Sequence, residues 1–189
     1  MTRTTRRALH QLREEQYGLG TIEFALTAPF LILLYLGSYQ LMDATSAYRK
    51  VTATTRTLAD VTTQFTSVQA ADVDGILGAS TTVMAPYAAS NATTRISEIA
   101  INTVGLPSVT WSRASGGVLL KTADLYVVPA VPNSIVPVAL RVPGTNLIFA
   151  EVTYSYTPTA GSQFLGPITF RDQIFMNPRR SNDIPCTGC

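Results

Sequence analysis

The chain is short of the side chains on which most catalysis depends. Its 189 residues include one histidine, His10, and two cysteines, Cys186 and Cys189, which both lie in the last four positions. Histidine is the commonest general base, and histidine and cysteine are the usual ligands of zinc. The composition therefore argues against hydrolytic and metal chemistry, and we expect no catalytic residue, no metal site and no cofactor.

Charge is also scarce. Only 14% of the residues are charged, against 46% hydrophobic, and 14 Lys and Arg stand against 12 Asp and Glu. This balance is too even for the basic surface that nucleic-acid binding requires, so we expect no nucleic-acid partner. The apolar content excludes an intrinsically disordered chain. The length allows one modest domain and an additional segment.

One long run lacks charge altogether. It extends over 24–42, from Phe24 to Met42, and as a helix it would be about 28 Å long, roughly the hydrocarbon core of a bilayer. The run predicts a single membrane-spanning helix. Four arginines before it favour a cytoplasmic N-terminus by the positive-inside rule, although Arg49 and Lys50 place positive charge near the other end as well.

A cleaved secretory signal peptide is the alternative interpretation of this region. Small residues around Ala44 and Ala47 could serve as its processing site. However, the apolar run is longer than a signal core of about 7 to 15 residues. A carboxylate, Glu23, also stands at its entrance. An ionised group there needs a partner, or a place in the first helical turn, where the helix dipole favours anions.

The residues around this carboxylate form a motif. Residues 18–24 read GLGTIEF, or G-x-x-x-x-E-F, directly before the apolar run. The motif resembles the processing site of type IV prepilins, and especially of the tight-adherence (Tad/Flp) pilus group. The resemblance implies that a prepilin peptidase cuts between Gly18 and Leu19 and that Phe24 belongs to the recognition signature. Residues 1–18 would then be a cleaved cytoplasmic leader.

Such a cut has a physical use. It exposes an ammonium group on Leu19, which Glu23 of a neighbouring subunit could neutralise inside a helical bundle where neither charge alone is tolerated. This pairing would set the axial register of the subunits. Gly18 has no side chain, which suits the close approach of a protease. Pro29, inside the span, removes one backbone hydrogen bond and predicts a helix kink.

Beyond the span an apolar period continues. One set of residues recurs every seven positions (Ala44, Val51, Leu58 and Phe65), and so does a second (Ala47, Thr54, Val61 and Val68). The spacing predicts one continuous helix over 19–70, with an amphipathic extension over 43–70. Its apolar stripe would pack either on the chain's own domain or on other subunits.

The remainder, 71–189, changes its pattern. Gly75 and Gly78 predict a break, followed by a short helix over 81–89 that Pro86 interrupts. Alternating or turn-bounded segments predict strands over 95–102, 109–113, 147–156 and 168–175, whereas 119–128 is ambiguous between strand and helix. Three prolines over 129–137 predict a loop, with one helical turn before Arg141. We therefore expect an α+β domain with an antiparallel sheet of three to five strands.

The strand over 147–156 has the clearest alternation. It predicts one buried face (Ile148, Ala150, Val152, Tyr154 and Tyr156) and one polar face (Glu151, Thr153 and Ser155).

A second resemblance starts in this strand. EVTYSYTP (151–158) and GPITFRDQIFMNPR (166–179) resemble the C-terminal half of TadE/TadG-like proteins, the minor pseudopilins of the Tad machinery. The two resemblances together cover roughly 15–70 and 145–180. They imply a structural subunit, not an enzyme, that helps to initiate or cap an adhesive Tad pilus or couples its base to the motor platform.

The resemblance also implies a location and partners. The protein would cross the bacterial inner membrane once, with a cytoplasmic N-terminus and a periplasmic C-terminal domain, and it could enter the pilus. Its partners would be a prepilin peptidase, the major Flp-type pilin, other pseudopilins, inner-membrane platform proteins and membrane lipid.

Two other functions stay open. In an oxidising compartment Cys186 and Cys189 are expected to form a structural disulfide. The same C-x-x-C could instead serve a membrane-anchored extracytoplasmic thiol oxidoreductase. A surface-binding module is the third possibility, with Trp111, Tyr154 and Tyr156 as contacts, although aromatic residues at strand spacing usually belong to the core.

Overall fold

The computed structural model describes residues 19–126, 134–159 and 166–189. The chain divides into two compact units, Met1–Asp43 and Ala44–Cys189, and the helix α2 (Leu19–Thr63) contributes to both. The fold is α+β, with one long N-terminal helix and an antiparallel sheet. The predicted fold class is confirmed at this level.

The second half of α2 packs on the sheet of its own unit. Ala47, Val51 and Leu58 are at most 2% exposed, and they belong to the same apolar cluster as Ile96 and Ile148 of the sheet. This part of the stripe therefore packs on the chain's own domain, one of the two partners that the sequence left open. The end of the stripe is less covered, because Val61 is half-buried and Phe65 is 36% exposed.

Most threonines in this part of the helix pair their hydroxyl groups with its backbone, although the buried Thr52 hydroxyl has no partner among the described residues. Thr54, Thr55 and Thr62 each donate a hydrogen bond to the backbone carbonyl four residues earlier, over 2.8 to 2.9 Å. Such bonds satisfy a hydroxyl in an apolar environment. This is why a threonine-rich sequence remains helical here despite its low intrinsic propensity.

The helix α2 ends at Thr63, so the predicted continuation to residue 70 is wrong. The chain turns and forms the short strand β1 (Val68–Gln69), which pairs in parallel with β6 (Cys186–Thr187) near the C-terminus. The Thr63 carbonyl accepts a hydrogen bond from the Arg179 N–H at 3.0 Å. Val68 fits the seven-residue apolar period of the sequence because its side chain is buried. It lies in the strand β1, however, and not in a helix.

The predicted break at Gly75 and Gly78 is also wrong, because both residues lie inside the helix α3 (Ala70–Met84). Glycine costs about 1 kcal/mol relative to alanine in a helix. Burial of Val73, Leu77 and Met84 outweighs that cost at about 1.5 to 3 kcal/mol for each large side chain. The helix ends before Pro86, not around it.

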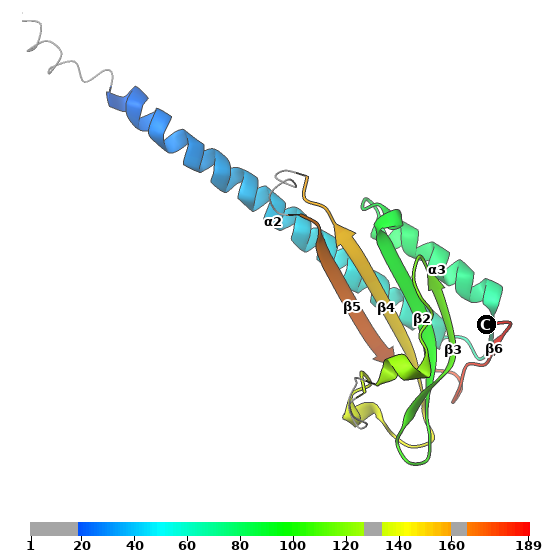
Figure 1. The fold of residues 1–189 in the computed structure, drawn as a ribbon. Coiled ribbons are helices and arrows are strands. Elements are labelled where there is room, and N and C mark those ends of the chain that lie inside the picture. The colour runs from blue at the N-terminus through cyan, green and yellow to red at the C-terminus, as the bar shows by residue number, and fades with distance from the viewer. Residues whose placement is uncertain (1–18, 127–133, 160–165) are drawn as a thin grey trace, which may run out of the picture. The chain divides into compact units, whose positions relative to one another are not determined.

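The main sheet has four antiparallel strands in the order β3-β2-β4-β5 (Figure 1). Their bounds are β2 Ala92–Ile101, β3 Pro107–Ser115, β4 Asn146–Tyr156 and β5 Ile168–Met176. All four predicted strand positions are confirmed, and so is the predicted strand number. Apolar residues of α2 and α3 share one core cluster with one face of this sheet.

A second apolar cluster covers part of the opposite face. Leu147 and Phe149 of β4 pack there with Leu125 and Val136, which come from the segment that carries the 3₁₀ turns η3 (Thr122–Leu125) and η4 (Val138–Leu140). The turn before Arg141 is thus confirmed. The described part of 119–128 forms a turn and no extended strand, so the strand alternative there is wrong.

The face of β4 expected to meet solvent does so only toward the end of the strand, where Ser155 is exposed and Thr153 is half-buried, whereas Glu151 is 6% exposed. The predicted alternation is therefore confirmed over 152–156 and wrong at Glu151. The other short turn, η2 (Ala89–Asn91), leads into β2.

Candidate functional site

The N-terminal part of α2 presents an uncovered apolar surface. Thirteen large apolar side chains between Ile22 and Met42 are 41% to 73% exposed. An 18-residue window of α2 has a mean hydropathy of 1.6, carries at most two charged residues and has no residue buried. By length and composition, α2 is one candidate membrane-spanning helix near the N-terminus.

The predicted processing site lies at the start of this helix. Gly18 lies outside the described residues, and α2 begins at Leu19. Glu23 follows one turn later and is exposed, and Phe24 is 67% exposed. The Glu23 carbonyl accepts a hydrogen bond from the Thr27 hydroxyl at 2.9 Å, and no ion pair of its carboxylate is found within the described parts of the chain.

The first turn of α2 contains no acidic residue, because Glu23 lies just beyond it. The helix dipole, which favours anions within the first turn, therefore does not account for this carboxylate. Residues 19 and 23 are, however, separated by four positions, so they lie on the same side of α2. A free ammonium group on Leu19 would therefore be on the helix face that carries Glu23.

Pro29 lies inside α2, and the helix continues on both sides of it. Nearby hydroxyl groups bond to the helix backbone, as at Ser38, which donates to the Leu34 carbonyl over 2.8 Å.

The structure joins Cys186 and Cys189 in a disulfide. Cys186 belongs to β6, which pairs with β1, and it packs at the margin of the main core cluster. The disulfide thus closes a short loop in the C-terminal tail, at the place where β6 pairs with the strand β1 that follows α2.

The three aromatic residues considered for surface binding are core residues. Trp111, Tyr154 and Tyr156 are only 3% to 6% exposed. The Trp111 indole N–H donates to the Ile184 carbonyl at 2.8 Å. Buried side chains offer no contact surface to a polymer, so this basis for a surface-binding module is wrong.

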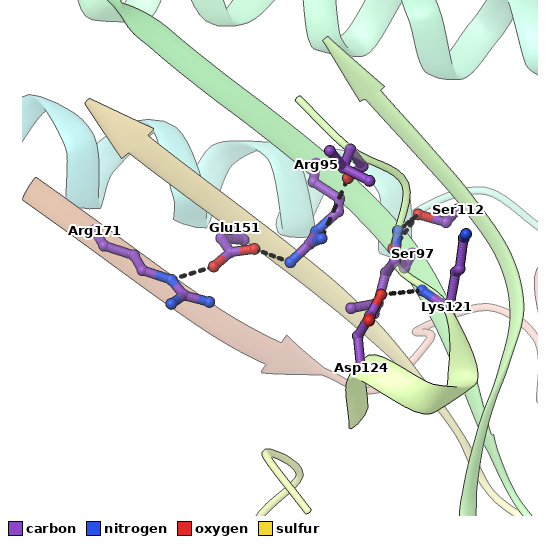
Figure 2. A network of polar contacts seen from close by, with 9 residues as sticks. Arg95, Ser97, Ser112, Lys121, Asp124, Glu151 and Arg171 are labelled. Carbon is purple, nitrogen blue, oxygen red and sulfur yellow. Dashed lines mark hydrogen bonds and ion pairs between the residues drawn. The ribbon is translucent and has the colours of Figure 1, made fainter. Parts of the chain in front are cut away.

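Two buried carboxylates were not predicted. Figure 2 shows Glu151 between Arg95 and Arg171, with one oxygen bonded to each guanidinium. Arg95 also donates to the Val118 carbonyl at 3.2 Å, and its guanidinium carbon lies 5.9 Å from the centre of the Phe149 ring. The alternation of β4 predicted that Glu151 lies on a polar face. Its partners Arg95 and Arg171 could not be predicted, because they reach Glu151 only through the register of neighbouring strands.

The second buried carboxylate is Glu98, which is 1% exposed. It accepts a hydrogen bond from the Ile184 N–H at 2.7 Å. Burial raises the pKa of the Glu98 carboxyl above its ordinary value near 4.5, the nearby negative charge of Asp183 raises the pKa further, and hydrogen bonds from Ile184 and Trp111 lower it. The arrangement attaches the C-terminal tail to β2.

Over the residues that the structure describes, no group of three or more His, Cys, Asp and Glu side chains is arranged to hold a metal ion. His10 lies outside those residues. Comparison of the chain with protein-family models, with curated proteins and with solved structures finds no match.

Proposed function

We propose that this protein is a TadE-like minor pseudopilin, a structural subunit that takes part in the assembly of a Tad-type pilus. In this proposal residues 1–18 are removed by a prepilin peptidase and 24–42 cross the inner membrane. The Ala44–Cys189 unit then lies in the periplasm. The observation that carries the proposal is an uncovered apolar helix with a carboxylate one turn after its start, at the G-x-x-x-x-E-F motif.

The exposed apolar surface supports the membrane part of the proposal. Transfer of one large apolar side chain out of water is worth about 1.5 to 3 kcal/mol. Thirteen such side chains along α2 therefore favour an apolar environment by a margin far larger than the stability of a typical domain. A lipid bilayer supplies that environment, and so do the helices of neighbouring subunits in a fibre.

Glu23 supports the assembly part. In this proposal its carboxylate pairs with the ammonium group of Leu19 on a neighbouring subunit. Residues 19 and 23 are about 6 Å apart along the helix axis, so the pairing fixes neighbours at an offset of about one helical turn. Each charge offsets part of the cost of burying the other.

The direct test is the N-terminal sequence of the mature protein isolated from its native membrane. We expect a chain that begins at Leu19. A chain that begins near Ala44 or Tyr48 would instead identify a discarded secretion signal, and an intact Met1 would exclude processing.

The role of Glu23 is tested separately. We expect Glu23→Ala and the isosteric Glu23→Gln to abolish the protein's part in fibre formation, because both leave the terminal ammonium without a counter-charge. The readouts are pilus number by electron microscopy and the amount of processed protein in the membrane. Glu15→Ala is the matched control, since that carboxylate leaves with the leader. Normal fibres with Glu23→Gln would contradict the proposal.

A further inference from the structure

Two adjacent basic residues of α2 are left without a counter-charge. Arg49 is exposed and Lys50 is half-buried, and neither side chain forms an ion pair within the described parts of the chain. Several other arginines are each paired with a carboxylate, namely Arg95, Arg113, Arg171 and Arg179. Two neighbouring positive charges on α2 are therefore available to an anion from outside the chain.

These two residues lie close to the end of the uncharged run. The run ends at Met42, and Met42 and Arg49 belong to the same helix. Seven helical residues cover about 10 Å of axis. The headgroup layer of a bilayer extends about 5 to 8 Å beyond the hydrocarbon core on each side. With 24–42 in the core, as proposed above, the backbone at Arg49 and Lys50 lies just outside the headgroups.

The direction of helical side chains brings the two charges back toward those headgroups. Every Cα–Cβ bond of an α-helix tilts toward the N-terminus, which in α2 is the side of the apolar run. The long stems of arginine and lysine let their charged groups reach a polar boundary at some distance from the backbone. Arg56 lies about 21 Å of helix axis beyond Met42, which is too far for the same contact.

The residue before this pair suits the same boundary. Tyr48 is 47% exposed, and its ring packs edge-on against Phe170, with ring centres 5.8 Å apart. Phe170 in turn stacks on Tyr156 at 5.7 Å. Tyrosine is enriched where a membrane meets water, because its ring is apolar and its hydroxyl is polar. A supported aromatic ring thus accompanies the two cations.

We propose that Tyr48, Arg49 and Lys50 bind the headgroup of an anionic phospholipid such as phosphatidylglycerol. The inference rests on the membrane insertion of α2 that is part of the proposed function. An anionic lipid is specified because two cations repel the ammonium group of a zwitterionic headgroup. Asp43 is the nearest carboxylate of α2 in sequence, and with its charge counted the segment 43–50 keeps a net charge of +1.

The chain offers matched double variants for the test. Arg49→Gln with Lys50→Gln, the site variant, removes both proposed contacts and keeps part of each stem. Arg56→Gln with Arg180→Gln, the control variant, removes two positive charges elsewhere. Arg56 and Arg180 are exposed, and neither forms an ion pair over the residues that the structure describes. Fluorescence of the single tryptophan, Trp111, checks that both variants fold.

The full chain is reconstituted in nanodiscs of mixed phosphatidylcholine and phosphatidylglycerol. A small fraction of one of the two lipids carries a diazirine on its headgroup, and the labelled peptides are mapped after irradiation. Label in 44–56 is counted separately from label in 1–18, because the arginines of the leader also attract anionic lipid. We expect the phosphatidylglycerol label in 44–56 to fall about tenfold in the site variant and to stay within about twofold in the control variant. The phosphatidylcholine label should stay within about twofold in both variants.

Three results would overturn the lipid site. Equal phosphatidylglycerol label in the two variants would mean that net charge alone attracts the lipid. An equal fall of both probes in the site variant would identify a change in the depth of α2. Unchanged lipid label with an altered oligomeric state would identify a protein partner.

The same experiment separates this inference from the proposed function. Phosphatidylcholine label on the chain without a preference for phosphatidylglycerol in 44–56 would overturn the lipid site alone. Absence of both labels from the whole chain would contradict membrane insertion, and the proposed function would fail with it.

Discussion

Glu98 is a titratable group that also attaches the C-terminal tail to the sheet. Its carboxylate is buried and accepts the Ile184 N–H, while burial raises its pKa. In the unfolded chain the same group titrates near 4.5. Between these two pKa values the folded state binds more protons than the unfolded state, so the free energy of unfolding falls as the pH rises through that interval.

We therefore expect Glu98→Gln to flatten the pH dependence of stability. The amide oxygen can still accept the Ile184 N–H, but it carries no charge that must be buried. Relative to this variant, the unmodified chain should lose stability as the pH rises from about 4.5, measured by denaturant titrations of Trp111 fluorescence at several pH values. A difference that does not change with pH would contradict the assignment.

Glu98→Ala serves as the comparison. It leaves the buried Ile184 N–H without its acceptor, which costs about 1 to 3 kcal/mol. That loss should persist at every pH, which separates the hydrogen bond from the charge.

Sequence patterns identify few of these residue-scale features. The G-x-x-x-x-E-F motif and the C-x-x-C pair are local, so they are readable directly. Glu98 and Glu151 depend on partners from distant segments, Ile184 for one and Arg95 and Arg171 for the other. Such partners meet only through strand register and the path of the tail, which a single sequence does not encode in any short window.

At the scale of the element, leucines of the same helix α2 occupy two different environments. Leu58 is 2% exposed in the core, whereas Leu41 is 70% exposed. We expect Leu58→Ala to lower the free energy of unfolding of the Ala44–Cys189 unit by about 2 to 5 kcal/mol, because it creates a cavity. Leu41→Ala should change it by less than about 0.5 kcal/mol.

Urea titration of the full chain in detergent micelles, followed through Trp111, measures both effects. Equal losses of unfolding free energy in the two variants would contradict the division of α2 into an uncovered part and a packed part.

The elements themselves were predictable to different degrees. The strands were identified from alternation or, over 109–113, from the flanking turn residues, and each strand has at least one face in an apolar cluster. The end of α2 was missed because the chain after it contacts Arg179 and β6. These partners lie more than a hundred residues later, so no local pattern announces them. The helix α3 was missed because its glycines weaken the local signal, while tertiary burial of Val73 and Leu77 outweighs it.

At the scale of the whole molecule, removal of the disulfide tests the building-block role against the oxidoreductase role. Cys186 and Cys189 close a very short loop, and the chain-entropy contribution of such a loop is about 2 kcal/mol or less. We expect the double variant Cys186→Ser with Cys189→Ser to keep pilus assembly, with a modest loss of stability of the unit.

The measurement is pilus number together with the urea midpoint of the purified chain. Complete loss of function with an unchanged midpoint would favour thiol chemistry over the structural role.

The pairing of β1 with β6 has a consequence for how the chain is made. Val68 lies directly beside Cys186, so this contact joins a segment synthesised early to one that is synthesised much later. Contacts between such distant positions form late, since a long loop must close first. Until Thr187 has left the ribosome, the turn after α2 has no strand to pair with, and a nascent chain stalled before Pro185 would present an unfinished edge to chaperones and proteases.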